Sequence, residues 1–176
     1  YSSGGGVGIV GKGFNLQGIE SISIDTRHGL PKYDGSDTYI INGSLCQYSG
    51  GKWEVKRETS YSRIKNAWIE GGGQDENYFV IKEKNGITKV YGKTAWSGAS
   101  ADKKYIYYLD SVTDGFGNVI TYNYSENKKE VRLESISYGK DGAQRIALKY
   151  DKREDVRLDG RGKYVKRDSG LLHSVT

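Results

Sequence analysis

Glycine-containing turn pairs divide this chain into short segments, and their spacing constrains the fold more than any other feature of the sequence. Asn42-Gly43, Asn85-Gly86 and Asp141-Gly142 are dipeptides that accept the backbone angles of tight hairpin turns. The segments between such turns alternate apolar and polar residues with the period of two that is typical of half-buried strands. Few stretches show the period of an amphipathic helix, so the pattern predicts successive antiparallel hairpins.

The hairpins are predicted along nearly the whole chain. We expect strands at residues 19–25, 37–42, 44–49, 52–57, 61–68, 77–83, 87–92, 105–110, 119–125, 130–138 and 143–151. The clearest hairpin has Asn85-Gly86 in a predicted type I′ turn, and residues 93–104 are predicted to form a polar loop. The alternation slips by one residue between Leu133 and Ile136, which predicts a β-bulge there.

The composition agrees with an all-β fold. The chain holds 15 Tyr and 25 Gly but only one Pro, and aromatic residues and glycines favour strands and tight turns. The hairpins are expected to form a curved sheet or a sandwich-like slab, and the pattern alone leaves open whether the sheet closes into a barrel. We expect residues 1–176 to be a single domain with an ordered, glycine-rich opening segment at 1–18. A chain without Met that begins with Tyr1 is expected to be a fragment of a longer protein.

The charge pattern argues against a nucleic-acid partner. The formal net charge is +5, but the densest basic stretch, residues 152–166, is interleaved with acidic residues. A phosphate-binding surface needs basic residues gathered on one face. The longest apolar run is also far shorter than the roughly 20 residues that span a bilayer, so no membrane insertion by this fragment is expected.

Motifs for nucleotide binding and nucleophilic catalysis are weak. Residues 6–11 match the pattern GxGxxG, but neither a strand before them nor a helix after them is predicted, and dinucleotide binding needs both. His28, His173 and the lone Cys46 lie in no catalytic motif and are too few for a structural zinc site. The sequence therefore predicts no catalytic residues and no cofactor.

Pairs of carboxylates were considered as acid and base groups or calcium ligands. Asp34 and Asp37, or Asp110 and Asp114, have suitable spacing for a pair, and Asn118 adds an oxygen to the second. Aspartates beside glycines in turns more often accept hydrogen bonds from nearby backbone N–H groups, and the spacing does not match an EF-hand. We therefore predict turn capping and no metal site.

The tyrosines have two interpretations. Tyr105 and Tyr107 share one face of a predicted strand, and Tyr122 and Tyr124 share a face of the next. Such rings line sheet cores, with their hydroxyl groups at the edge, or they form an exposed surface that binds glycans or proteins. Exposure separates the two, because a binding face must present several rings to solvent.

Five stretches, in order, resemble a known family. They are YSSGGGVGIVGKGFNLQGIESIS at the start, in which Phe14 stands where Trp is usual, HGLPKYDGSDTYIINGSL at 28–45, EKNGITKVYG at 83–92, LDSVTDGFGNVITYNYSE at 109–126, and YDKREDV followed by SGLLHSV at the end. Together they resemble the SpvB-type N-terminal region of Tc insecticidal toxin B components and bacterial virulence plasmid B proteins. The fourth stretch also resembles single Rhs or YD repeats.

This resemblance implies a structural role in a secreted or surface protein. In the family, the region helps to build a hollow β-sheet shell that encloses a toxic polypeptide, joined to a β-propeller and to Rhs repeats. Catalysis in the virulence proteins lies in a separate domain, so the resemblance carries no catalytic residues onto this chain. The partners it implies are the remainder of the parent chain or other toxin subunits. The alternative is an adhesion module that uses the tyrosine-rich face.

Overall fold

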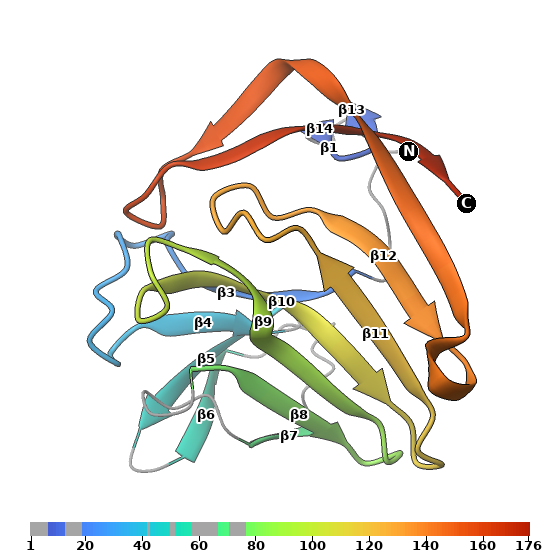
Figure 1. Ribbon diagram of the computed structural model, residues 1–176. Coiled ribbons are helices and arrows are strands. Elements are labelled where there is room, and N and C mark those ends of the chain that lie inside the picture. The colour runs from blue at the N-terminus through green and yellow to red at the C-terminus, as the bar shows by residue number, and fades with distance from the viewer. Residues whose placement is uncertain (1–6, 13–18, 42, 50–51, 58–66, 71–76) are drawn as a thin grey trace.

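The computed structural model describes residues 7–12, 19–41, 43–49, 52–57, 67–70 and 77–176. In these ranges the backbone forms strands and turns, with a short 3-10 turn at Lys140–Gly142 and no α-helix (Figure 1). The strands are β1 (Val7–Gly8), β2 (Gly11–Lys12), β3 (Ser21–Ile24), β4 (Thr38–Ile41), β5 (Ser44–Ser49), β6 (Lys52–Arg57), β7 (Ala67–Glu70), β8 (Phe79–Glu83), β9 (Thr88–Gly98), β10 (Lys104–Thr113), β11 (Val119–Tyr124), β12 (Leu133–Tyr138), β13 (Gln144–Asp159) and β14 (Lys166–Val175). The predicted all-β class is confirmed.

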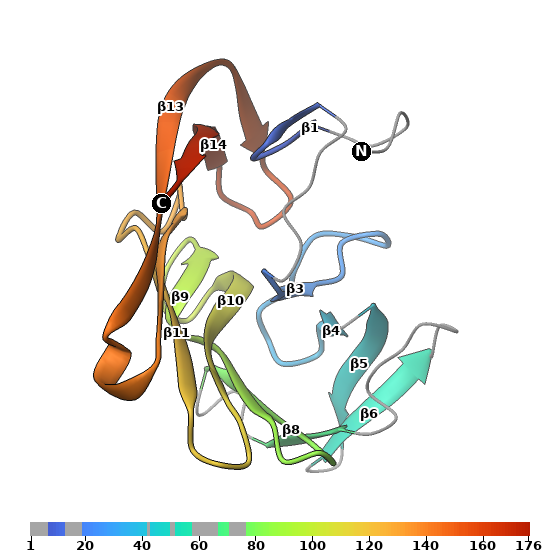
Figure 2. The ribbon, with the colours of Figure 1, turned by 90° about the vertical axis from the view of Figure 1, so that its right-hand side faces the viewer.

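One large sheet contains all strands except the small β1–β2 hairpin. Its main path runs β14-β13-β12-β11-β10-β3-β4-β5-β6, and β9, β8 and β7 extend from β10 in that order. Every pairing is antiparallel, as expected for hairpins with short connections. Figure 2 shows the sheet following an open arc from β13 and β14 through β11 and β10 toward β8, so the curved-sheet prediction is confirmed.

The sheet forks at β10. A strand has two hydrogen-bonding edges, and β9 runs along one of them from Thr88 to Gly98. On the other edge, β3 pairs with residues 106–108 and β11 with residues 111–113. Two leaves therefore diverge from one strand: an N-terminal leaf, β3–β6, and a C-terminal leaf, β11–β14.

The core fills the space between the N-terminal leaf and β8–β10. Its buried side chains are Ile22, Ile41, Cys46, Phe79, Ile81, Tyr91, Tyr107 and Leu109. Burying one large aliphatic or aromatic side chain contributes about 1.5–3 kcal/mol, so this cluster holds the leaf against the strands that it crosses. The alternation that predicted the strands also selects these inward-facing residues.

The turn at Asn85-Gly86 forms where it was predicted, but it is not a type I′ turn. A type I′ turn needs positive φ at both central residues, whereas Gly86 has φ 85° and Asn85 is not among the residues with positive φ. The Gly86 N–H donates to the Glu83 carbonyl at 2.9 Å and the Glu83 N–H donates to the Ile87 carbonyl at 2.8 Å. These bonds define a three-residue loop with glycine in the left-handed position, so the type I′ assignment is wrong.

The strand predictions fail mainly where pairing is irregular. Residues 93–98 were predicted as loop but belong to β9, and β13 continues past residue 151 to pair with β14, which was not predicted. The predicted strand at 61–68 lies almost entirely outside the described residues. The predicted bulge is confirmed, because Asn123 pairs with Ser135 and Tyr124 with Leu133, which leaves Glu134 as the extra residue.

Among the described residues, no helix is long and apolar enough to cross a membrane.

Candidate functional site

The glycine-rich motif at residues 6–11 has a different geometry from a dinucleotide-binding turn. Gly6 lies outside the described residues, but Val7 pairs with Lys12 and Gly8 with Gly11 in a small hairpin. A dinucleotide site needs a strand-to-helix turn within this motif, whereas residues 7–12 form a hairpin whose Ile9 carbonyl accepts the Leu172 N–H at 2.7 Å. The motif therefore attaches the opening segment to β14.

Cys46 and His173 are not brought together, and His28 is exposed in the connection between β3 and β4. Cys46 is fully buried in β5, where burial raises the pKa of its thiol to about 11 and keeps it protonated at neutral pH. His173 lies on β14, with its Nδ1 2.8 Å from an Asp151 carboxylate oxygen on an exposed surface. Strands β5 and β14 are near opposite ends of the strand order and stand apart in both ribbon views (Figures 1 and 2).

Three of the four candidate carboxylates cap turns. Asp34 accepts the Ser36 N–H at 2.9 Å, Asp37 accepts the Tyr33 N–H at 2.7 Å, and Asp114 accepts the Asn118 N–H at 2.9 Å. These bonds satisfy backbone donors that tight turns leave without strand partners. Within the part of the chain that the structure describes, no group of three or more His, Cys, Asp or Glu side chains could hold a metal ion.

Asp110 has a different role, because it fills a wide bulge in β9. Tyr91 pairs with Leu109 and Trp96 with Tyr107, so four β9 residues, 92–95, lie opposite Tyr108 alone. The Asp110 carboxylate, in a residue only 8% exposed, accepts N–H bonds from residues 93, 94 and 95 at 2.7, 3.1 and 2.9 Å. It also accepts the Thr94 hydroxyl. One carboxylate thus replaces the strand partners that the β9 bulge, residues 92–95, has lost.

A buried lysine fixes the same bulge from the other side. Lys104, 6% exposed, donates from Nζ to the Gly92 carbonyl at 2.8 Å and to the Asn77 carbonyl at 2.6 Å. Its ammonium lies 5.4 Å from the Trp96 ring centroid and 5.8 Å from that of Tyr107, and burial lowers its pKa. Sequence reasoning missed this cluster, although the break in alternation after residue 91 was a signal.

The four tyrosines predicted as a possible binding face do not share one surface. Tyr105 and Tyr107 are 4% and 5% exposed. The Tyr107 ring packs edge-on against Phe79, with centroids 4.9 Å apart, while Tyr105 faces Tyr164 at 6.4 Å. Two rings of the proposed face are therefore interior, and their role in binding stays a prediction.

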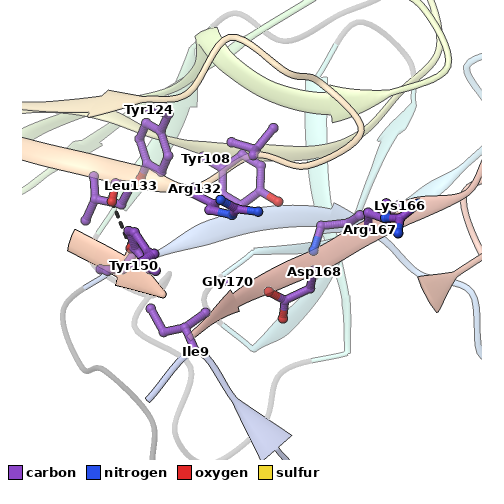
Figure 3. Close-up of a pocket in the computed structure, with 12 residues that line it drawn as sticks. Ile9, Tyr108, Tyr124, Arg132, Leu133, Tyr150, Lys166, Arg167, Asp168 and Gly170 are labelled. Carbon is purple, nitrogen blue, oxygen red and sulfur yellow. Dashed lines mark hydrogen bonds between the residues drawn. The ribbon is translucent and has the colours of Figure 1, made fainter. Parts of the chain in front are cut away.

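The second pair of tyrosines separates at the fork. Tyr122 packs against the core, whereas the Tyr124 ring lies 5.4 Å from Tyr108. Tyr108 alternates with Tyr107 along β10 and so points to the opposite side of the strand. The Tyr108–Tyr124 pair forms one wall of a cavity of about 140 Å³, which we call the fork cavity (Figure 3).

The geometry defines a class of structural β-sheet module. Its antiparallel sheet is open and forked, and its described aspartates and buried lysine form hydrogen bonds that stabilise turns and the β9 bulge. A family model described as "Salmonella virulence plasmid 65kDa B protein", SpvB, matches residues 1–157. The chain belongs to this SpvB family, which confirms the resemblance drawn from its motifs. It is therefore a module of a toxin-associated type.

Curated relatives are longer proteins. The chain is 29% identical over 182 aligned residues to "Mono(ADP-ribosyl)transferase SpvB" of Salmonella choleraesuis (strain SC-B67), and equally to that of Salmonella dublin. The alignment covers 85% of this chain but 30% of the relative in each case. The chain thus spans less than a third of the length of these transferases.

Solved structures share the fold. The N-terminal domain of effector protein SpvB from Salmonella typhimurium strain LT2 matches 99% of this chain and 79% of that domain, with a TM-score of 0.76 at 18% identity. A chain of the Photorhabdus luminescens Tc holotoxin pore gives a TM-score of 0.78 at 14% identity, over 98% of this chain and 11% of that one. A chain of the TcdB2-TccC3-Cdc42 structure gives 0.75 at 15% identity, over 98% and 12%.

Proposed function

We propose that this chain is a non-catalytic wall module of a secreted toxin or virulence protein, where it helps to form a β-sheet shell around a toxic polypeptide. The observation that carries the proposal is the open, forked, curved sheet, whose path ends at β14 and β6 instead of closing on itself. Strand edges of this kind are suited to pairing with further strands. The natural partners are the remainder of the parent chain, including β-propeller or Rhs segments, or other toxin subunits.

The polar residues support a structural role. Asp110 and Lys104 are the kind of buried ionisable groups that catalytic sites also contain. Here their hydrogen bonds go to backbone groups of residues 77 and 92–95, which leaves them engaged in holding the β9 bulge. The relatives are named mono(ADP-ribosyl)transferases, and we assign that activity to the part of their chains that does not align with this one.

The adhesion alternative has less support. It requires several tyrosines on one solvent-facing surface, and Tyr105 and Tyr107 are almost fully buried. Their packing against Tyr164 and Phe79 is what a wall with an aromatic interior would show.

Protease protection in the parent protein tests the shell. We would compare the wild type with Asp110→Ala, which removes the acceptor for the β9 bulge, and with Asp114→Ala, which removes a turn cap on the surface. The enclosed polypeptide should resist protease in the wild type and in Asp114→Ala, and should be cut faster in Asp110→Ala. Equal cutting in all three proteins would contradict the proposal.

The absence of catalysis has its own test. The isolated chain should bind NAD no better than millimolar by isothermal titration, because residues 7–12 form a hairpin where a dinucleotide site has a strand-to-helix turn. Micromolar NAD binding would overturn the proposal that the chain is non-catalytic. The proposal that it forms a shell would still be decided by the protease experiment.

A further inference from the structure

Phe116 is the most exposed large apolar residue in the part of the chain that the structure describes. It lies in the turn between β10 and β11 and is 94% exposed, whereas Phe79 in the core is 1% exposed. Glycines on both sides leave the ring uncovered. Nothing lies within 4 Å of a Cβ placed on Gly117, and only the Asn85 carbonyl oxygen, at 3.9 Å, approaches one on Gly115. Phe is among the residue types most often fully buried, so a ring held in solvent is unusual.

Hydrogen bonds fix the backbone that carries this ring. The Asp114 carboxylate accepts the N–H groups of Phe116 and Asn118, each at 2.9 Å, and the Asn118 side-chain amide at 2.8 Å. The Asp114 N–H donates to the Asn118 carbonyl at 3.0 Å, and the Gly117 N–H donates to the Asp114 carbonyl at 3.1 Å. A group that is already held in position loses less conformational entropy when it binds. The ring is therefore presented on a pre-organised turn.

A second turn lies against this one. A Cβ on Gly86 would lie 3.4 Å from the Gly115 Cα, so the turn between β8 and β9 and the turn between β10 and β11 are neighbours at one end of the sheet (Figures 1 and 2). We call these two turns, residues 84–87 and 114–118, the paired tip. Val119 follows the tip directly and adds apolar surface, because it is 43% exposed. The paired tip is thus an exposed surface that presents one aromatic ring.

The charges on the paired tip argue against a membrane as the partner. Lys84 is its one cation, and Asp114 carries the opposite charge. Clusters of basic residues attach proteins to anionic bilayers, and a single apolar anchor gives only marginal membrane binding. A protein surface with an apolar pocket suits the ring better, because buried aromatic anchors supply much of the binding energy of protein interfaces.

The energy of the contact decides which protein surface can hold the tip. Burying one Phe side chain contributes about 1.5–3 kcal/mol, whereas micromolar association of separate molecules needs about 8 kcal/mol. A pocket in the same polypeptide meets the tip at an effective concentration of about millimolar, so a small contact suffices there. The relatives show that such chains have the required length, because the alignment covers only 30% of them.

We propose that Phe116 docks into an apolar pocket of the parent protein, in a region outside the part that aligns with this chain. The pre-organised turn supplies the anchor, and Val119 packs at the rim of the pocket. The proposal rests on the proposed function, since it names the contact that joins one end of the wall module to the rest of the shell.

Hydroxyl-radical footprinting of the parent protein, without lipid, measures the exposure of each ring. Phe116 and Phe79 are the same residue type, so a docked Phe116 should be oxidised within about threefold of the rate of the buried Phe79. The protection should persist on dilution from about 10 μM to about 10 nM, because a contact within one polypeptide does not depend on concentration. Faster oxidation of Phe116, or protection that is lost on dilution as for a contact with a second copy, would overturn the proposal.

Two variants of the parent separate the anchor from a general loss of apolar surface. Phe116→Ala should undock the paired tip, so the Gly86 amide, which donates to the Glu83 carbonyl, should exchange at least about tenfold faster, the factor that burial of one aromatic side chain supplies. Leu158→Ala changes a β13 residue that is 66% exposed and should leave this exchange rate unchanged. Equal exchange in wild type and Phe116→Ala, or equal acceleration in both variants, would show that the ring is not the anchor.

The anchor and the shell can fail separately. If the enclosed polypeptide resists protease while Phe116 is oxidised as an exposed ring, the shell stands and the anchor is wrong. If Phe116 is protected while the polypeptide is cut equally in wild type and Asp110→Ala, the anchor stands and the shell is wrong. Asp114→Ala keeps the ring, so this variant remains a valid control for the shell.

Discussion

The β9 bulge and the fork cavity both bury polar atoms beside β10. These atoms are hydrogen-bonded in the bulge, whereas two of them are unpaired at the cavity. In the bulge, Asp110 accepts three backbone N–H groups and the Thr94 hydroxyl, and Lys104 donates to two backbone carbonyls. In the cavity, Tyr124 and Arg132 keep buried atoms that no described group pairs. Complete pairing fixes the conformation of the bulge, whereas each unpaired buried atom beside the cavity lowers the stability of the fold.

The comparison predicts its largest stability effect at Asp110. Asp110→Ala leaves three N–H groups, one of them in the buried Ala95, without an acceptor and the Lys104 charge without its neighbour, so the free energy of unfolding should fall by about 3–5 kcal/mol. Urea unfolding of the isolated chain measures this. The control is Asp114→Ala at an exposed turn, which should cost much less because water replaces the lost acceptor. Equal losses would show that the bulge depends on Asp110 no more than a surface turn depends on its cap.

Gly92 tests the same bulge through sterics. Its φ is 71°, and a Cβ would come within 2.3 Å of the Tyr107 ring, so Gly92→Ala combines backbone strain with overpacking and should cost about 2–4 kcal/mol. Gly117 has a similar φ of 87° but no atom within 4 Å of its Cβ position. Gly117→Ala should therefore show the strain alone, about 1 kcal/mol. Thermal unfolding of the two variants separates the contributions.

A substitution in the hairpin turn at Gly86, which belongs to neither the β9 bulge nor the fork cavity, should have a smaller effect on stability. Gly86→Val places a β-branched residue at φ 85° and should reduce the free energy of unfolding by about 1–2 kcal/mol. A wild-type melting temperature would mean that the turn readily adopts another conformation.

The smallest expected effect is a pH dependence at the fork. Burial opposes ionisation of Glu130, but hydrogen bonds from Ser169 and Arg132 outweigh it and lower the pKa below its ordinary value of 4.5. The stabilisation is therefore present above about pH 4.5 and is lost as the pH falls through the lower, native pKa. The protection factor of the Ser169 amide, which donates to Glu130 at 3.0 Å, should fall in acid once the intrinsic exchange rate at each pH is divided out. In Glu130→Gln this acid dependence should disappear; if it persists, another group controls the β14 contact.

The turns were predictable from sequence and the fork was not. Asn-Gly and Asp-Gly pairs set backbone angles locally, so the hairpins were found even where the turn type was wrong. The β9 bulge escaped because residues 92–95 find their acceptor in Asp110, on the neighbouring strand. The pairing of Ile22 with Tyr107 joins segments that are far apart in sequence, and no local pattern encodes it.

The candidate site was harder still to anticipate. Alternation predicted Tyr105 and Tyr107 on one face, but it could not show that both side chains are buried. The fork cavity gathers residues from β10, β11, β12, β13, β14 and the opening segment. Nothing in the sequence separates the role of Tyr124 from that of Tyr150. In the structure, the Tyr150 hydroxyl donates to the Leu133 carbonyl, whereas the Tyr124 hydroxyl has no hydrogen-bond partner among the described residues.

The shared edge of β10 also orders events during synthesis of the chain. Strands β3 to β6 emerge from the ribosome early and can pair with one another, but β3 finds its place only after residues 106–108 have been made. Until then its inner residues, such as Ile22 and Ile41, have no strands of β8–β10 to cover them. Non-local pairing of this kind is slow and leaves apolar surface open to aggregation. We therefore expect the nascent N-terminal leaf to need a chaperone until β10 is complete.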